Sequence, residues 1–156
     1  AQILSPIYPF IGEANSDSIV MRLVYGKISF LLTGDLDFKG EQRMTKIDHS
    51  TVLKVGHHGS STSTSAEFLK AVAPAYAVIS VGEHNKFRHP SFAALKRLGS
   101  AGVKYYRTDW DGMVVVRTDG RRISVQCRKL SRYSRTQPPA SGWPARYRGP
   151  RPLRPG

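Results

Sequence analysis

The sequence predicts an α/β fold, in which a sheet is covered by helices. Two observations favour it: short apolar and β-branched runs alternate with helix-like segments, and polar residues gather where those runs end. At 156 residues the chain is long enough for one domain. Sheets of this class place their sites just beyond the strand ends, so the strand-end residues are the first candidates for function.

The first half of the chain predicts a hairpin, a helix and a further strand. Pro6 and Pro9 interrupt the first apolar segment, which therefore suits a sheet edge. Gly26-Lys27 separates two strand-like runs and predicts a tight turn, and Asp37 is available as a helix N-cap. The expected elements are an extended edge over residues 3–11, strands over 19–25 and 28–33, a helix over 37–46 and a strand over 51–55.

The second half predicts two more helix and strand alternations and a closing hairpin. Ser65 is the expected N-cap of a helix that stops before Pro74. Asp111-Gly112 and Asp119-Gly120 have the composition of hairpin turns. The remaining expected elements are a strand over 76–81, a helix from Pro90 or Ser91 to Gly99 or Gly102, and strands over 103–107, 113–117 and 123–127.

Charge and composition divide the chain into a domain over residues 1–127 and a basic, Pro- and Arg-rich tail over 128–156. From Arg121 onward there are ten basic residues and no acid, and without these ten the net charge of +13 falls to about +3. The tail has few aliphatic residues, and we expect it to be disordered. It is either a solvated linker or a nucleic-acid contact that uses its arginines together with its aromatic residues, Tyr133, Trp143 and Tyr147.

Cysteine content and hydropathy exclude some protein classes. Cys127 is the single cysteine, so an intramolecular disulfide and a cysteine-rich zinc module are excluded. No apolar run approaches the roughly 20 residues that a membrane-spanning helix needs. The chain starts at Ala1 without an initiator Met, and we expect it to be a piece of a longer protein.

The most informative stretch is residues 52–61, an apolar run that ends in His57, His58, a glycine and two serines. Asp35 closes a similar run, and a third run is followed by residues 82–90, which contain Asn85 and His89. A carboxylate and imidazoles from separate strand ends suit Zn²⁺, Mn²⁺ or Fe²⁺. Two such ions about 3.5–4 Å apart would activate water and bind a phosphoryl oxygen. The polar residues expected to contact phosphate or substrate are Ser60, Ser61 and Asn85.

Simpler interpretations apply to some of these residues. A single histidine is more often structural or solvated, and that interpretation is kept for His49 and His84. Adjacent residues of a strand point to opposite faces, so at most one of His57 and His58 is expected to bind metal unless the loop has already begun. Ser60 lacks the Gly-x-Ser-x-Gly surroundings of a hydrolase nucleophile.

Six segments, in order and with similar spacing, resemble the C-terminal metallo-β-lactamase-fold domain of the ComEC competence proteins, a family of DNA-uptake channels. The family patterns are Asn-x-x-Ser-Leu-Val-Leu-Arg-Leu, Leu-Leu-Thr-Gly-Asp, Val-Leu-Lys-Val-x-His-His-Gly-Ser, Tyr-Ala-Val-Ile-Ser-Val-Gly, Asn-x-Tyr-x-His-Pro and Tyr-Arg-Thr-Asp-x-Asp-Gly. They correspond to residues 15–23, 30–35, 52–60, 76–82, 85–90 and 106–112.

The resemblance implies an αβ/βα sandwich with a metal-dependent phosphodiesterase or nuclease centre that acts on DNA, single-stranded or duplex. By position, Asp35 would be a bridging metal ligand and His57 a ligand or site residue. His58 would be its catalytic-site neighbour, and His89 would contact metal or the scissile phosphate. The cofactor would be a pair of divalent ions, Zn or Mn, with no small-molecule cofactor. The protein would be attached to a bacterial inner membrane, on a side that the sequence does not indicate.

One family motif is absent from this sequence. The His-x-His-x-Asp-His segment supplies most of the metal ligands, and no histidine precedes His49. We therefore expect the chain to be the C-terminal half of the domain, inactive alone, with the N-terminal half-domain and the membrane channel as partners. The alternatives are a hydrolase of the same superfamily that acts on small esters or lactones, and a non-catalytic nucleic-acid-binding module that uses the basic tail.

Overall fold

The computed structural model describes residues 1–128, which form a six-stranded sheet, a two-stranded sheet and four helices. The strands are β1 (Gln2–Ser5), β2 (Val20–Tyr25), β3 (Ile28–Leu32), β4 (Val52–Lys54), β5 (Tyr76–Ile79), β6 (Lys104–Arg107), β7 (Met113–Thr118) and β8 (Ile123–Arg128). The helices are α1 (Phe38–Arg43), α2 (Ala66–Val72), α3 (Phe92–Ser100) and α4 (Thr108–Asp111), with a short 3₁₀ segment η1 (Gly56–Gly59). The mixed α/β class predicted from the sequence is confirmed.

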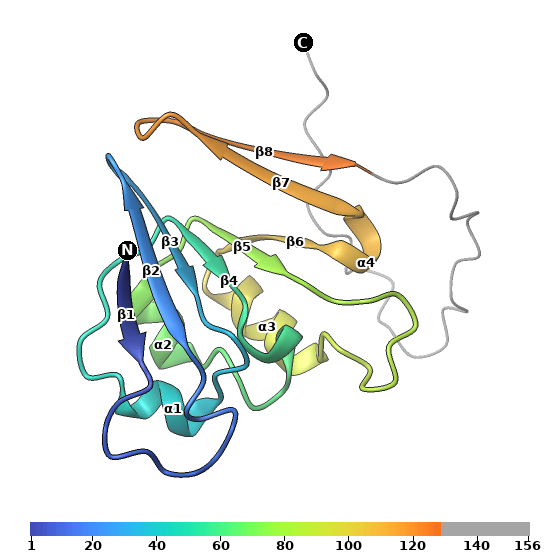
Figure 1. Cartoon of the computed structure of the whole chain (residues 1–156). Coiled ribbons are helices and arrows are strands. Elements are labelled where there is room, and N and C mark those ends of the chain that lie inside the picture. The colour runs from blue at the N-terminus through green and yellow to red at the C-terminus, as the bar shows by residue number, and fades with distance from the viewer. Residues whose placement is uncertain (129–156) are drawn as a thin grey trace.

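Strands of the large sheet follow one another in chain order, from β1 to β6. The first three are antiparallel, and β3 to β6 are parallel. Each parallel crossover contains one of the helices α1, α2 and α3. Right-handed crossovers that always advance in the same direction place their helices on one face of a sheet. Figure 1 shows this arrangement, with α1 to α3 on one side of the sheet and the β7–β8 hairpin on the other.

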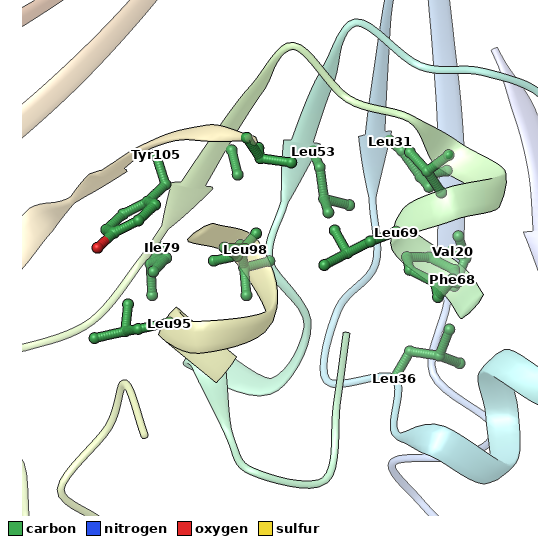
Figure 2. Packing of buried hydrophobic residues seen from close by; sticks show 14 of the residues in the cluster. Val20, Leu31, Leu36, Leu53, Phe68, Leu69, Ile79, Leu95, Leu98 and Tyr105 are labelled. Carbon is green, nitrogen blue, oxygen red and sulfur yellow. The ribbon is translucent and has the colours of Figure 1, made fainter. Parts of the chain in front are cut away.

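The hydrophobic core lies between the large sheet and helices α2 and α3 (Figure 2). Leu31, Leu53 and Ala77 are neighbours across β3, β4 and β5, and none of them is exposed to solvent. Leu31 and Leu53 face Leu69 of α2 and Leu98 of α3, which are also buried. Each leucine buried in this way contributes roughly 1.5–3 kcal/mol, so this layer holds the parallel strand ends in place.

The predicted N-caps Asp37 and Ser65 are confirmed, and Ser91, which the sequence predicted only as a possible first residue of its helix, is a third N-cap. The side chains of Asp37, Ser65 and Ser91 accept hydrogen bonds from the third backbone N–H of α1, α2 and α3, at 3.0, 3.1 and 3.2 Å. The hairpins at Gly26-Lys27 and Asp119-Gly120 are also confirmed. Their tips meet, because the Lys27 N–H donates to the Gly120 carbonyl at 2.6 Å.

The predicted hairpin turn at Asp111-Gly112 is wrong, because β6 and β7 belong to different sheets. The residues between them form α4. Asp111 accepts from the Arg107 N–H at 2.8 Å, and Asp109 forms two hydrogen bonds with the Arg107 guanidinium. Both carboxylates thus find partners within one helical turn, and Gly112 then redirects the chain with φ +72°.

Two further sequence expectations concern the basic tail and membrane-spanning helices. Apart from Arg128, the basic tail predicted over 128–156 lies outside the described residues, so its boundary and its disorder stay predictions. Within residues 1–128, no helix combines the length and the apolar character required to cross a bilayer.

Candidate active site

The candidate residues come together at the carboxyl ends of β3, β4 and β5. Asp35 lies three residues beyond β3, the His57-His58 pair lies in η1 after β4, and Ser80 follows β5. Because these strands are parallel neighbours, their carboxyl ends meet at one edge of the sheet. The predicted meeting of Asp35 with the histidine pair is therefore seen in the structure.

His58 contacts Asp35. Its Nδ1 lies 2.6 Å from the Ser80 carbonyl, and its Nε2 lies 3.4 Å from Oδ1 of Asp35. A carbonyl only accepts, so Nδ1 carries the proton and Nε2 of a neutral ring is left with a lone pair that faces a carboxylate. A hydrogen-bond donor or a cation between the two acceptors would satisfy both of them. A backbone carbonyl on the other ring nitrogen is also the usual support for a metal-binding histidine.

His57 and His89 form a second pair beside the first. Their ring centroids are 5.7 Å apart at 70°, and Phe87 stacks on His89 at 5.8 Å and 18°. Nδ1 of His57 is buried without a hydrogen-bond partner in the described structure. Burial, reinforced by the nearby His57 and His58, lowers the pKa of His89, while Asp35 opposes the shift. His89 is therefore neutral at pH 7 and has a lone pair available as an acceptor.

The backbone at the histidine pair is left-handed. His57, His58 and Gly59 have φ angles of +45°, +53° and +81°, a conformation that costs roughly 1–2 kcal/mol for each non-glycine residue. The loop has thus begun before His57, and the alternation of an extended strand does not separate the two side chains. It is His58 that meets Asp35, whereas His57 as a metal ligand stays a prediction.

Two charged residues that the sequence analysis missed hold the loop over residues 56–65, called here the histidine loop. Buried Glu41 accepts from the Thr64 and Ser65 N–H groups, and the Arg97 guanidinium donates to three carbonyls of the loop. Burial raises the pKa of Glu41 and lowers that of Arg97. No local pattern marks either residue, because each acts on a segment more than 20 positions away.

Lys54 also lies beside the site. Its Nζ donates to the Gly34 carbonyl at 3.0 Å and to the Val55 carbonyl at 3.3 Å. Burial lowers its pKa, and the negative charge of Asp35 partly offsets this effect. The lysine ties the ends of β3 and β4 together and places a cation near Asp35. In the sequence, Lys54 is marked by its charge inside an apolar strand and by its match to the lysine of the family pattern over residues 52–60.

The residues predicted to contact phosphate have different surroundings. Ser60 is buried, and its hydroxyl lies 3.1 Å from that of Thr62, whereas Ser61 is exposed. The Asn85 amide donates to the Gly82 and His89 carbonyls and accepts from the His89 N–H. Asn85 therefore holds His89 in place, and its role toward phosphate stays a prediction, as do those of the two serines.

The residues present fit only part of a metal site. Asp35 and His58 offer two donors of suitable chemistry on one side, but zinc takes about four ligands. Within residues 1–128, no three His, Cys, Asp or Glu side chains gather closely enough to hold an ion.

A protein-family model matches more than half of this chain. The family model described as the metallo-beta-lactamase superfamily matches residues 3–84. The chain belongs to the metallo-β-lactamase superfamily. Its mixed α/β architecture is therefore that of a member of this superfamily.

Curated relatives confirm the resemblance to ComEC-type competence proteins. Competence protein ComA of Neisseria gonorrhoeae is 47% identical over 104 residues, 64% of this chain and 15% of the relative. ComE operon protein 3 of Bacillus subtilis is 38% identical over 122 residues, 76% of this chain and 16% of the relative. Recombination protein 2 of Haemophilus influenzae is 40% identical over 129 residues, which are 80% of this chain and 16% of the relative. The chain thus spans about one sixth of the length of these relatives.

Proposed function

We propose that this chain forms one side of a metal-dependent phosphodiesterase or nuclease centre in a ComEC-like protein of DNA uptake. The observation that supports it most directly is the pair of Asp35 and His58, held 3.4 Å apart at the ends of parallel strands in a chain similar to competence proteins. The donors that the pair lacks would come from a segment with the His-x-His-x-Asp-His motif.

Each residue has a distinct part in this proposal. A bound Zn or Mn ion, or a pair of them, would supply an activated water and positive charge for a phosphoryl oxygen. Asp35 and His58 would hold one side of the metal, with His57 as a further candidate. His89, neutral and adjacent, would accept a hydrogen bond at the reacting group. Ser61 is exposed at the same loop and would donate to phosphate.

The partners in this proposal are DNA, the N-terminal half-domain and the membrane channel of the same protein. This assignment places the chain at a bacterial inner membrane as part of that protein. It is supported by relatives whose names refer to competence and recombination, and of which this chain covers about one sixth.

A reconstitution assay tests the proposal. The purified chain is incubated with linear DNA and Mn²⁺ or Zn²⁺, alone and with a family polypeptide that carries the His-x-His-x-Asp-His segment. We expect no cleavage by the chain alone and metal-dependent cleavage by the mixture. Asp35→Ala and His58→Ala should each abolish that cleavage, because each removes a metal donor. Asp48→Ala is the matched control, since Asp48 is 75% exposed and precedes the amino end of β4, whereas the candidate site lies beyond the carboxyl ends of the strands.

Two results would contradict the proposal in different ways. Strong cleavage by the chain alone, lost in Asp35→Ala, would show that the expected inactivity is wrong. Cleavage by the mixture that survives both Asp35→Ala and His58→Ala would show that the site is elsewhere. A mixture that hydrolyses small esters or lactones but not DNA would favour the alternative substrate class.

A further inference from the structure

The loop over residues 82–89 presents an aromatic ring between two cations. Lys86, Phe87 and Arg88 are consecutive and exposed, with 67% of Phe87 accessible. A single exposed aromatic residue is common on protein surfaces. The position of this ring is more specific, because Phe87 stacks on His89 at the edge of the candidate active site and the Lys86 Nζ lies 5.0 Å from the ring centroid.

A cavity of about 460 Å³ opens beside this ring. Phe87 and His89 line it together with His58, Val81 and Thr108. Its volume is within the range of small-molecule sites, and the walls are mostly rings and hydrocarbon. The cavity therefore connects His58, the partner of Asp35, with an exposed aromatic surface.

Most polar groups around this cavity already have partners. Asn85 uses its amide on Gly82 and His89, and the Thr108 hydroxyl contacts the Val81 N–H and carbonyl, each at 2.7 Å. His58 Nδ1 donates to the Ser80 carbonyl. The cavity therefore offers ring faces to a ligand and few groups that could read the edge of a base.

We propose that Phe87 is a stacking site for an unpaired base of a single-stranded nucleic acid, with Lys86 and Arg88 on the neighbouring phosphates. This inference rests on the proposed function, because it names the substrate form that the site receives. A ring between cations is the combination that binds single strands with little sequence preference. Bases in a duplex are stacked on one another, so their faces are not available to Phe87.

Binding measurements without metal test this inference independently of cleavage. The full chain is titrated with single-stranded oligonucleotides that contain 2-aminopurine, and with the same sequence as a duplex, in the presence of EDTA. Phe87→Ala should weaken single-strand binding roughly five- to 150-fold, the equivalent of about 1–3 kcal/mol of base stacking. It should also relieve the quenching of 2-aminopurine, and Phe87→Trp should restore both signals.

A matched control shows whether weaker binding results from the loss of stacking on Phe87 or from the loss of any exposed aromatic ring. Phe10 is 62% exposed, and its ring centroid lies 6.1 Å from that of Tyr8. Phe10→Ala should leave affinity and quenching unchanged. Equal weakening by Phe10→Ala and Phe87→Ala, or no weakening by Phe87→Ala, would overturn the proposal. Equal loss of duplex and single-strand binding in Phe87→Ala would also overturn it.

The two cations are tested by salt dependence. Each phosphate contact to a single strand contributes about 0.7 to the slope of log K against log salt. Lys86→Gln combined with Arg88→Gln should therefore lower the slope by about 1.4, whereas Phe87→Ala should leave it unchanged. Lys70→Gln with Lys96→Gln makes the same charge change on exposed positions of α2 and α3 and should not alter the slope. If the slope is unchanged in the Lys86→Gln and Arg88→Gln double variant, these two residues do not contact phosphates and that part of the proposal is wrong.

The two proposals fail in distinguishable ways. If Phe87-dependent stacking is observed but the reconstituted mixture does not cleave DNA, the base site survives and the nuclease proposal fails. If the mixture cleaves DNA and Phe87→Ala leaves single-strand binding intact, the nuclease proposal survives and the base site fails.

Discussion

The histidine loop and the 82–89 loop both border the candidate active site, but they are held in opposite ways. The histidine loop donates hydrogen bonds to Glu41 of α1 and to the Gly34 carbonyl beyond β3, and it accepts hydrogen bonds from Arg97 of α3. In the part of the chain that the structure describes, the hydrogen bonds of the 82–89 loop are formed among its own residues, chiefly by Asn85.

This difference separates two tasks. Metal donors must stay within a fraction of an ångström of their productive positions, and many long-range hydrogen bonds achieve that. A surface that stacks on successive bases of a flexible strand needs exposed side chains more than rigidity. The two loops therefore suit fixed chemistry on one side and adaptable substrate contact on the other.

Glu41→Ala tests the rigid side and should have the largest effect. Glu41 is 6% exposed, and its loss leaves the Thr64 and Ser65 N–H groups without their carboxylate acceptor. We expect the free energy of unfolding to fall by about 3–5 kcal/mol, measured by urea denaturation. Glu67→Ala, an exposed glutamate in the first turn of α2, should change it by less than about 1 kcal/mol. Similar values for the two variants would show that the histidine loop does not depend on Glu41.

Gly59→Ala and Gly82→Ala compare the two loops directly. Gly59 has φ +81°, and a Cβ there would lie 2.6 Å from Cβ of Pro90. The left-handed backbone and the clash together should cost about 2–4 kcal/mol of unfolding free energy and displace His89. A Cβ at Gly82 would meet no atom within 4 Å, so Gly82→Ala should cost about 0.5 kcal/mol or less. Equal thermal denaturation midpoints would contradict the contrast between the loops.

The titration of Glu41 should make the free energy of unfolding depend on pH, with a smaller effect than the two substitutions above. Burial raises the pKa of Glu41 above its ordinary value of 4.5, so the folded state holds this proton to a higher pH than the unfolded chain does. The contribution of the protonated group is complete below pH 4.5 and is lost as pH rises through the folded pKa. Urea denaturation of the wild type and Glu41→Gln across this range should show the wild type losing stability relative to the variant. If the wild type instead gains stability relative to Glu41→Gln as pH rises, the hydrogen bonds from the Thr64 and Ser65 N–H groups lower the pKa of Glu41 more than burial raises it.

Much of the fold could be predicted from local signals. Strand positions, two of the three predicted hairpin turns and the capping residues Asp37 and Ser65 follow from composition and spacing, because a cap or a turn acts within a few residues. The turn at Asp111-Gly112 could not be predicted in this way. Its aspartates are used by Arg107 in a helical turn, a choice that depends on contacts outside the turn pattern.

The residues of the candidate site are also only partly predictable from the sequence. Asp35, His57, His58 and His89 were identified as strand-end residues, and the structure brings them to one edge of the sheet. Glu41 and Arg97 escaped prediction because the segments that they hold are distant in the chain.

Local patterns are enough to place histidines and an aspartate after buried strands, because alternation and turn composition are local. Which histidine meets Asp35 depends instead on contacts between distant segments. The left-handed turn of residues 57–59 releases both rings from strand alternation, and the Ser80 carbonyl of the neighbouring strand then orients His58 toward the carboxylate. That orientation depends on three parallel strands ending side by side, which long-range packing of the sheet against α2 and α3 provides.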